Sequence, residues 1–377
     1  MKDNLKFFKL GELAEIFAGG DKPDNFNLTK TEEYQIPVFA NGETNKGLQG
    51  FTNKARVKQP SVTVSARGTI GYTVLRNEPF VPIVRLLTLI PDREKLDIEY
   101  LYYYLTLFRQ TGLGSSQAQL TVPDISNRKI SIRNLLTQKA IGATLSLLDK
   151  KIELNNKINN ELEKMAKTLY NYWFVQFDFP DDNGKPYKSS GGKMIWNNEL
   201  KKEIPNGWCV KKVSDLLPVV TGKQDANFAT ENGEYNFFTC GEEILKCDTY
   251  EFEGKAILVA GNGNFNIKLY EGKFNAYQRT YILIPNDERY YTLVYLAVRD
   301  RIASLAKGSR GSIVKFITKG DLEDIKIPLP KDENLDVFSQ LNIITKKIEK
   351  NILENQKLIE LRDWLLPMLM NGQISIK

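Results

Sequence analysis

The feature that most constrains this chain is a heptad-like spacing of apolar residues that occurs twice. Apolar or Asn residues recur at alternating intervals of four and three from Leu148 to Trp173, and similar types return from Ile344 to Leu369. A period near 3.5 predicts a helix that buries a narrow stripe against a partner helix. We predict that the two segments pair with each other. The predicted seam is Leu148, Ile152, Asn155, Asn159, Leu162, Leu169, Ile344, Ile348, Asn351, Asn355, Leu358 and Leu365. The alternative is two amphipathic helices that each pack on a local domain.

Each copy of the seam contains two Asn residues one step apart in an otherwise mainly aliphatic stripe. An Asn that faced a Leu would lose its hydrogen bonds, so polar seam residues reduce stability but fix the alignment and choice of partner. This pattern favours pairing within the chain over unspecific helix association.

The blocks that precede the two helices resemble each other in the order of their elements. Val213–Leu216 repeats the pattern of Leu10–Leu13, and the helical stretch Thr292–Leu305 repeats Ile98–Phe108. We therefore predict an α+β chain built as a pseudo-two-fold internal repeat: two similar, β-rich domains with two long helices that pair as an antiparallel coiled coil. The predicted boundaries are 1–137 for the first domain, 138–176 for the first helix, 177–205 for a linker, 206–337 for the second domain and 338–377 for the second helix and tail.

Composition narrows the class of protein. The 377 residues are 42% hydrophobic and 26% charged, which is typical of globular domains, and the net charge of +6 suits a polyanionic partner. Three cysteines without a CxxC pair, no apolar run long enough for a membrane span and no apolar signal segment at Met1 predict a cytoplasmic protein.

The sequence lacks the motifs of several classes of enzyme. The chain has no histidine, which removes Ser-His-Asp sites, His metal ligands and His bases. Gly261-Asn-Gly263 lacks a third glycine and is interpreted as a turn, no P-loop is present, and no Pro-Pro-aromatic loop could hold a flipped adenine. We predict no catalytic residues, no bound metal and no cofactor on this chain.

The loops of both blocks carry cations interleaved with amides and hydroxyls. Lys and Arg neutralise phosphates, and Asn, Gln and Arg form paired hydrogen bonds with base edges. A solvated surface explains any single residue, but matching loops in two repeats favour DNA contact, and Arg76, Asn262 and Arg279 belong to the wider set. The candidates are Lys22, Lys46, Arg67, Thr69, Gln117, Gln119, Lys223, Lys246, Asn264, Lys268, Arg310 and Lys315.

The stretch between the two blocks carries the most specific pattern. It reads Tyr172-Trp-Phe-Val-Gln-Phe-Asp-Phe-Pro180, then Asn183-Gly-Lys-Pro-Tyr-Lys-Ser-Ser-Gly-Gly-Lys193, then Ile204-Pro-Asn-Gly-Trp208. This resembles the central region of the specificity subunits of Type I restriction–modification systems. The resemblance covers the whole chain in the order of a first target recognition domain, a helix, a second target recognition domain and a second helix.

The resemblance implies a non-catalytic subunit that binds double-stranded DNA with a split recognition sequence. It implies two modification subunits as partners, which methylate adenine at N6 with S-adenosylmethionine, and motor–nuclease restriction subunits that complete a defence against foreign DNA. S-adenosylmethionine is thus expected on the partner. The helices would act as a ruler between half-sites, and their outer faces, with the aromatic end at Tyr170, Tyr172, Trp173 and Phe174, would contact the modification subunit. The aromatic end could instead pack onto the opposite recognition domain.

Three alternatives remain open at this point. A scaffold that binds only protein would show no salt-dependent affinity for DNA. A methyltransferase that acts alone would transfer methyl groups as a purified chain. A specificity subunit of a related combined cutting and methylating system would be distinguished by the sequence of its partner.

Overall fold

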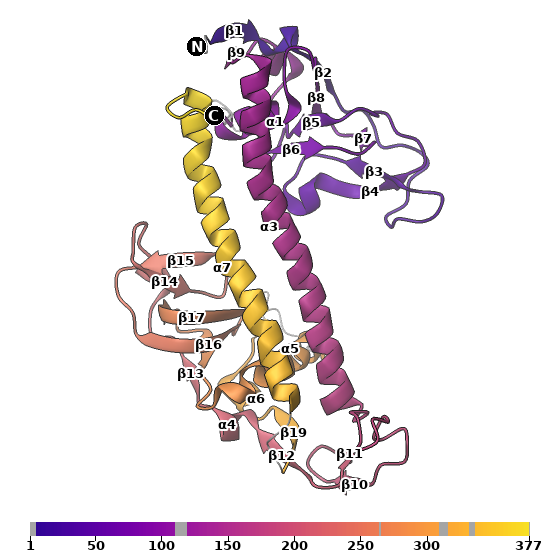
Figure 1. Cartoon of the computed structure of the whole chain (residues 1–377), viewed down its shortest axis with the longest axis vertical. Helices are drawn as coiled ribbons and strands as arrows, with labels where there is room; N and C mark the ends of the chain where they lie inside the picture. The colour runs from indigo at the N-terminus through magenta and orange to yellow at the C-terminus, as the bar shows by residue number, and fades with distance from the viewer. Residues whose placement is uncertain (1–4, 110–118, 264, 309–315, 332–335, 377) are drawn as a thin grey trace. The chain divides into compact units, whose positions relative to one another are not determined.

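The computed structural model describes residues 5–109, 119–263, 265–308, 316–331 and 336–376 (Figure 1). Its contacts divide into two compact units, Met1–Leu154 with Asn355–Lys377, and Asn155–Glu354. Both divisions fall inside long helices, so each unit contains one globular domain and about half of each helix. Among the described residues, no helix is long and apolar enough to cross a membrane.

The first unit contains a small β-rich domain. Its elements are β1 (Lys6–Lys9), η1 (Leu10–Glu12), β2 (Ala14–Ala18), β3 (Ile36–Phe39), η2 (Thr44–Gly47), β4 (Leu48–Thr52), β5 (Ser61–Val64), β6 (Thr73–Arg76), β7 (Val81–Pro82), β8 (Leu87–Pro91), α1 (Ile98–Leu107), α2 (Val122–Ser126) and β9 (Lys129–Ile132). The strands form sheets ordered β2-β8-β5-β6 and β4-β3-β7, and β1 pairs with β9.

The second unit begins in the first long helix and continues through a hairpin into the second domain. Its elements are the second half of α3 (Leu135–Tyr170), η3 (Asn171–Val175), β10 (Met194–Asn197), β11 (Lys202–Pro205), β12 (Trp208–Lys212), α4 (Val213–Leu216), β13 (Val219–Thr221), η4 (Ala226–Phe228), β14 (Tyr235–Phe238), β15 (Ile244–Cys247), β16 (Phe252–Ala260), β17 (Ile267–Ala276), β18 (Thr280–Leu283), η5 (Glu288–Tyr290), α5 (Tyr291–Gly308), α6 (Lys319–Glu323), β19 (Lys326–Pro330) and the first half of α7 (Asp336–Asn371).

The two domains share one topology. The second sheet is ordered β13-β18-β16-β17-β14-β15, and β12 pairs with β19 as β1 pairs with β9. In the first domain β6 and β7 together occupy the place of β17: β6 is antiparallel to β5 and β7 is parallel to β3, whereas β17 makes both contacts as one strand. The predicted fold class, two similar domains with paired long helices, is confirmed.

Corresponding caps show why the same elements form from different sequences. Thr121 caps α2 and Thr318 caps α6, each with an Asp at the third helical position whose carboxylate accepts from the capping N–H at 2.8 Å. Such reciprocal bonds satisfy donors that a helix start leaves unpaired. Leu120–Arg133 therefore contains a capped helix followed by β9.

The long helices run antiparallel within each unit. In the first unit the Arg362 guanidinium of α7 donates to Asp149 of α3 at 2.8 Å. In the second unit Asn351 Nδ2 donates to Asn159 Oδ1 at 2.7 Å, and Asn155 donates to Glu354 at 2.9 Å. In these contacts residue numbers rise along one helix as they fall along the other, as in an antiparallel pair. Every predicted seam residue is buried or half-buried.

Each domain is fastened by a partly buried polar contact to the first half of the long helix that follows it. In the first unit Gln138 accepts from the Asp97 N–H at 2.9 Å and donates to the Lys95 carbonyl at 3.0 Å. In the second, the Thr292 hydroxyl donates to Asn342 Oδ1 at 2.7 Å. Apolar clusters surround both contacts, so each helix half belongs to the core of its unit.

The segment expected to be a linker with few contacts is packed into the second unit. Phe179 stacks on Trp173, Tyr187 and Trp208 at centroid distances of 5.1, 4.8 and 5.2 Å. Aromatic burial of this kind fixes a chain that turn-forming residues alone would leave loose. The residues that carry the family resemblance thus form a structural cluster after α3.

Candidate nucleic-acid interface

Four loops of the first domain are tied together at one edge of its sheets. Asn41, which follows β3, accepts from the Ala66 N–H after β5 and donates to the Val84 carbonyl after β7, both at 2.7 Å. The Val84 N–H donates to the Gly20 carbonyl after β2 at 2.8 Å. The loops that carry the candidate DNA-binding residues therefore converge.

The second domain closes the corresponding edge in the same way. The Gly261 N–H after β16 donates to the Arg279 carbonyl after β17 at 2.9 Å. Asn266 Nδ2 donates to the Cys240 carbonyl after β14 at 2.9 Å. Both domains thus present a cluster of strand-connecting loops on a rigid sheet, which is where binding residues are commonly placed.

Backbone hydrogen bonds define which positions correspond. The Gly19 N–H donates to the Leu86 carbonyl as that of Gly222 donates to Thr280, at 2.8 and 2.9 Å. A side chain on Gly19 or Gly222 would lie 2.7 or 2.3 Å from the backbone at the end of β7 or β17, so both positions require glycine.

The same comparison aligns the loops that carry the candidate residues. The Leu120 N–H donates to the Ala66 carbonyl at 2.9 Å, and the Ile317 N–H donates to the Gly261 carbonyl at 2.8 Å. Ala66 therefore corresponds to Gly261, Arg67 to Asn262 and Gln119 to Phe316. The sequence comparison had aligned whole elements but not these individual positions.

Arg67 and Gln119 are brought together by the fold. Nε and one terminal nitrogen of the exposed Arg67 guanidinium donate to Gln119 Oε1 at 3.0 and 2.6 Å. Thr69 lies half-buried in the same loop. Held at one edge by Gln119, the guanidinium keeps further N–H groups to offer to a phosphate or a guanine.

The other first-domain candidates lie on neighbouring loops. Lys22 is exposed, with its ammonium 3.5 Å from the centre of the Phe26 ring. Lys46 is exposed in η2 at a φ of 54°. Both remain predictions for DNA contact.

Arg76 was wrongly included in the wider set of exposed cations. Its side chain is buried on β6, donates to Thr63 Oγ1 at 3.1 Å and to the Lys46 carbonyl at 2.6 Å, and lies over the Phe39 ring. Burial lowers the pKa of Arg76 to about 10. The sequence could not reveal this because β6 is too short to show which side chains face the core.

In the second domain the candidate lysines differ in whether their ammonium groups are paired within the protein. Lys223 pairs with Glu251, and Lys268 donates to the Gly241 carbonyl and to Asn266 Oδ1. Burial lowers the pKa of Lys268. Lys246 is exposed at the end of β15. Gln117, Asn264, Arg310 and Lys315 lie outside the described residues.

Two exposed side chains at this edge were missed by the sequence analysis. Phe316 is 68% exposed beside Asn262, with which it forms an isolated bridge. Arg85 is exposed on the turn between β7 and β8. Phe316 directly follows the candidate Lys315 in the sequence but carries no polar group, whereas Arg85 is placed beside the candidate residues only by the alignment through hydrogen bonds.

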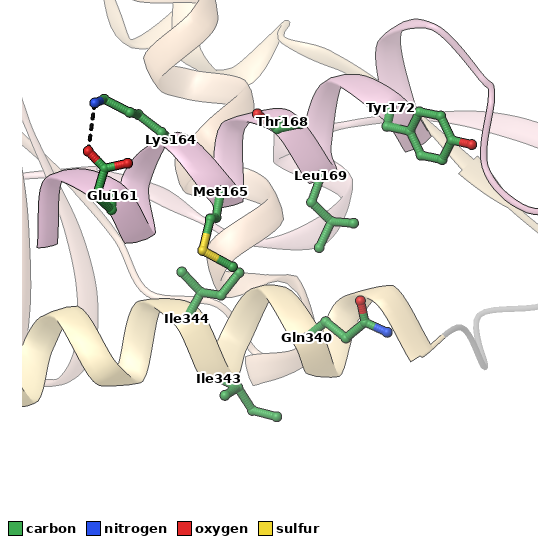
Figure 2. Close-up of a pocket in the computed structure, with 9 residues that line it drawn as sticks. All are labelled: Glu161, Lys164, Met165, Thr168, Leu169, Tyr172, Gln340, Ile343 and Ile344. Atoms are coloured by element: carbon green, nitrogen blue, oxygen red, sulfur yellow. Dashed lines mark hydrogen bonds and ion pairs between the residues drawn. The ribbon is translucent and has the colours of Figure 1, made fainter. Parts of the chain in front are cut away.

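A second surface lies on the helices of the second unit. Figure 2 shows a cleft lined by α3 and α7, with Met165, Leu169 and Tyr172 on one side and Ile343 and Ile344 on the other. Its volume is about 650 Å³. Met165 and Ile343 are 57% and 68% exposed.

The predicted aromatic end divides between two roles. Tyr170 and Phe174 are buried in the core of the second unit, where Phe174 packs on Trp208 and Phe338. Tyr172 lines the cleft. The alternative interpretation, packing onto the opposite domain, therefore holds for Tyr170 and Phe174. Among the described residues, no three His, Cys, Asp or Glu side chains group as metal ligands.

These features define a class: a duplicated recognition protein whose two domains present the same loop frame with different side chains. The family model for the type I restriction modification DNA specificity domain matches residues 2–164 and 205–361, and the chain belongs to this family. This confirms the resemblance carried by the segment after the first helix.

Individual relatives of the chain are also specificity subunits of this family. The type I restriction enzyme EcoDI specificity subunit of Escherichia coli is 38% identical over 178 residues, which cover 46% of this chain and 40% of that protein. The MjaIX specificity subunit of Methanocaldococcus jannaschii is 26% identical over 423 residues, covering 98% of this chain and 93% of that protein. The crystal structure of an S subunit from M. genitalium has the same fold, with a TM-score of 0.65 at 19% identity, covering 98% of this chain and 96% of that one.

Proposed function

We propose that this chain is the DNA-recognition subunit of a type I restriction–modification complex and that each domain reads one half of a split target. The observation that carries the proposal is the repeated loop frame with different occupants: Arg67 and Gln119 in one domain, Asn262 and Phe316 in the other. Similar scaffolds that carry unlike side chains suit the reading of unlike sequences. The recognition domains proposed are 1–137 and 206–337.

The helices are proposed to set the distance between the half-sites. Helix α3 is continuous over 36 residues, about 54 Å at 1.5 Å per residue. The hydrogen bond between Asn351 and Asn159 in the seam would fix how α3 and α7 align, so that the separation would not change by sliding.

The modification subunits are proposed to dock on apolar patches of the helices. The cleft of the second unit offers Met165 and Ile343. The corresponding positions of the first unit, 196 residues away, are Leu361 and Leu147, which are also exposed. Two equivalent patches suit two copies of the same partner.

The chemistry is proposed to reside on those partners. S-adenosylmethionine would bind the modification subunits, and this chain would hold no cofactor. Restriction subunits would join the complex of this chain with its two modification subunits, where the DNA sequence read by the loops decides whether DNA is methylated or cut.

Mapping N6-methyladenine in host DNA tests the function. We expect a two-part motif with a fixed gap that disappears when this chain is deleted and returns when it is restored. Methylation that survives the deletion, or a motif without a gap, would contradict the proposal.

Paired insertions test the ruler. Seven residues added to α3 after Leu154 and to α7 after Glu354 preserve the heptad phase and add about 10.5 Å. We expect the gap to lengthen by about three base pairs while both half-sequences stay the same, since base pairs rise about 3.4 Å. If complexes that contain the chain with insertions still methylate DNA at the original gap, the helices do not act as a ruler.

Charge substitutions test the docking patches. Met165→Glu and Leu361→Glu should each halve the amount of modification subunit that co-purifies, and the double variant should abolish it, because burying an unpaired carboxylate is unfavourable. Lys157→Glu on the exposed face of α3 is the control. Full retention of the partner by the double variant would place docking elsewhere.

A further inference from the structure

Residues that are identical at corresponding positions of the two domains mostly have a structural reason. Gly19 and Gly222 leave no room for a side chain. Phe39 and Phe238 are buried in the cores. Thr121 and Thr318 cap short helices. Each of these three identities is explained by the backbone, the core or a helix cap.

Arg85 and Arg279 are a further identical pair, and they occupy the same turn. The Ile83 N–H donates to the Phe39 carbonyl as that of Tyr277 donates to Phe238, at 2.8 and 2.9 Å. Three residues later the turn closes with the bond from Leu86 to Ile83, or from Thr280 to Tyr277. Arg85 and Arg279 are therefore the third residue of equivalent turns.

No structural role accounts for either arginine. Both side chains are exposed, and within the described residues neither forms a hydrogen bond or an ion pair. In the first domain the turn is strained, since Val84 and Arg85 have φ of 51° and 60° and Val84 is exposed. Positive φ is costly for a β-branched residue, and such strain persists where a turn must present a side chain.

Each arginine is adjacent to the position at which the domains differ. In the first domain Asn41 bridges the carbonyl of Val84 and the N–H of Ala66, next to Arg67. In the second domain the Arg279 carbonyl accepts directly from Gly261, next to Asn262. A constant cation thus accompanies a variable pair of side chains on each loop cluster.

We propose a division of labour on this edge: Arg85 and Arg279 each contact a DNA phosphate, while Arg67 with Gln119, and Asn262 with Phe316, read bases. Phosphate contacts position a protein without reading sequence, so the same residue serves both domains. Arg67 suits guanine, Asn262 suits adenine, and Phe316 offers an apolar contact to a thymine methyl.

Binding measurements on the complex of the full chain with its modification subunits test this inference, which rests on the proposed function. Arg85→Ala and Arg279→Ala should each weaken binding of specific and unrelated duplexes by similar factors, and each should lower the slope of log K against log salt by about one. The methylated motif should not change. Arg93→Ala, an exposed arginine beyond the opposite end of β8, should leave the slope as in the parent chain.

The reading positions are tested by exchanging them. Arg67→Asn with Gln119→Phe should alter the preferred base in one half-site and leave the other half-site and the salt slope intact. If the parent complex binds no DNA, the proposed function fails. If it binds but Arg85→Ala and Arg279→Ala keep the parent's salt slope, or change the motif, only the division of labour is overturned.

Discussion

Two asparagine side chains meet inside the seam of the second unit. Asn351 and Asn159 are buried and share a hydrogen bond of 2.7 Å. In the first unit a seam position of α7 carries Arg362, which binds Asp149 at 2.8 Å, and Asp149 also accepts from the Tyr103 hydroxyl at 2.6 Å. Burial and the neighbouring carboxylate raise the pKa of Tyr103. The seam is thus specified by polar pairs as well as by aliphatic residues.

The Asn pair makes a stability prediction. Asn351→Leu should lower the free energy of unfolding by about 1–3 kcal/mol, because Asn159 loses its buried partner. Asn159→Leu together with Asn351→Leu should recover most of that loss. Denaturant unfolding of all variants measures the coupling, and purely additive losses would show that the bond does not couple the helices.

The buried arginine of β6 makes a second prediction. Arg76→Ala should destabilise the chain by about 2–4 kcal/mol, because it removes charged hydrogen bonds to Thr63 and to the Lys46 carbonyl. Lys54→Ala, at an exposed position, should change stability by less than about 0.5 kcal/mol. Unfolding curves that coincide for Arg76→Ala and the parent would contradict a structural role.

Short elements are held by local chemistry that repeats in both domains. Helices α2 and α6 have five residues each and would not form alone. Their capping boxes and the packing of Ile125 and Leu322 into the cores compensate. The strand pairs β1–β9 and β12–β19 then lead the chain toward the long helices.

The caps make a prediction at this scale. Thr121→Ala and Thr318→Ala should each lower the free energy of unfolding by about 0.5–2 kcal/mol. Thr106→Ala, on the exposed face of α1, should not destabilise the chain. The comparison is made by denaturant unfolding, and a loss confined to one cap would break the equivalence of the domains.

The cap of α2 also makes a pH prediction. Hydrogen bonds from Thr121 lower the pKa of Asp124. Because the folded pKa lies below the unfolded one, the stabilisation is complete above the ordinary carboxyl pKa of about 4 and is lost as the pH falls through the folded value. The difference in unfolding free energy between the parent and Asp124→Asn should therefore decrease as the pH falls from 5 toward 3. If this difference does not change with pH, the Asp124 carboxylate is not the source of the stabilisation.

At the scale of the molecule, the two arginines that we propose as phosphate contacts lie in separate units. Arg85 lies in one unit and Arg279 in the other. Substitutions at sites without shared contacts usually add in free energy. The double variant Arg85→Ala/Arg279→Ala should therefore lose binding free energy equal to the sum of the single losses within about 0.5 kcal/mol. Equilibrium binding at one salt concentration measures this, and a large excess over the sum would indicate that the surfaces depend on each other.

The sequence by itself determined the architecture. The 3.5-residue period and the paired Asn residues predict helices that bury one stripe, and the order of turns and helices predicts a duplicated domain, because periodicity and capping are local properties. The absence of histidine and of phosphate-binding loops removed several catalytic classes.

Only the tertiary structure decided which loop residues share a surface and which are buried in the core. Arg76 and Arg85 look alike in the sequence, yet one is buried over Phe39 and the other is exposed on a turn. Gln119 meets Arg67 across 52 residues of chain, and Phe316 takes the corresponding place in the second domain. Such contacts depend on hydrogen bonds between strands distant in sequence, and no local pattern encodes their alignment.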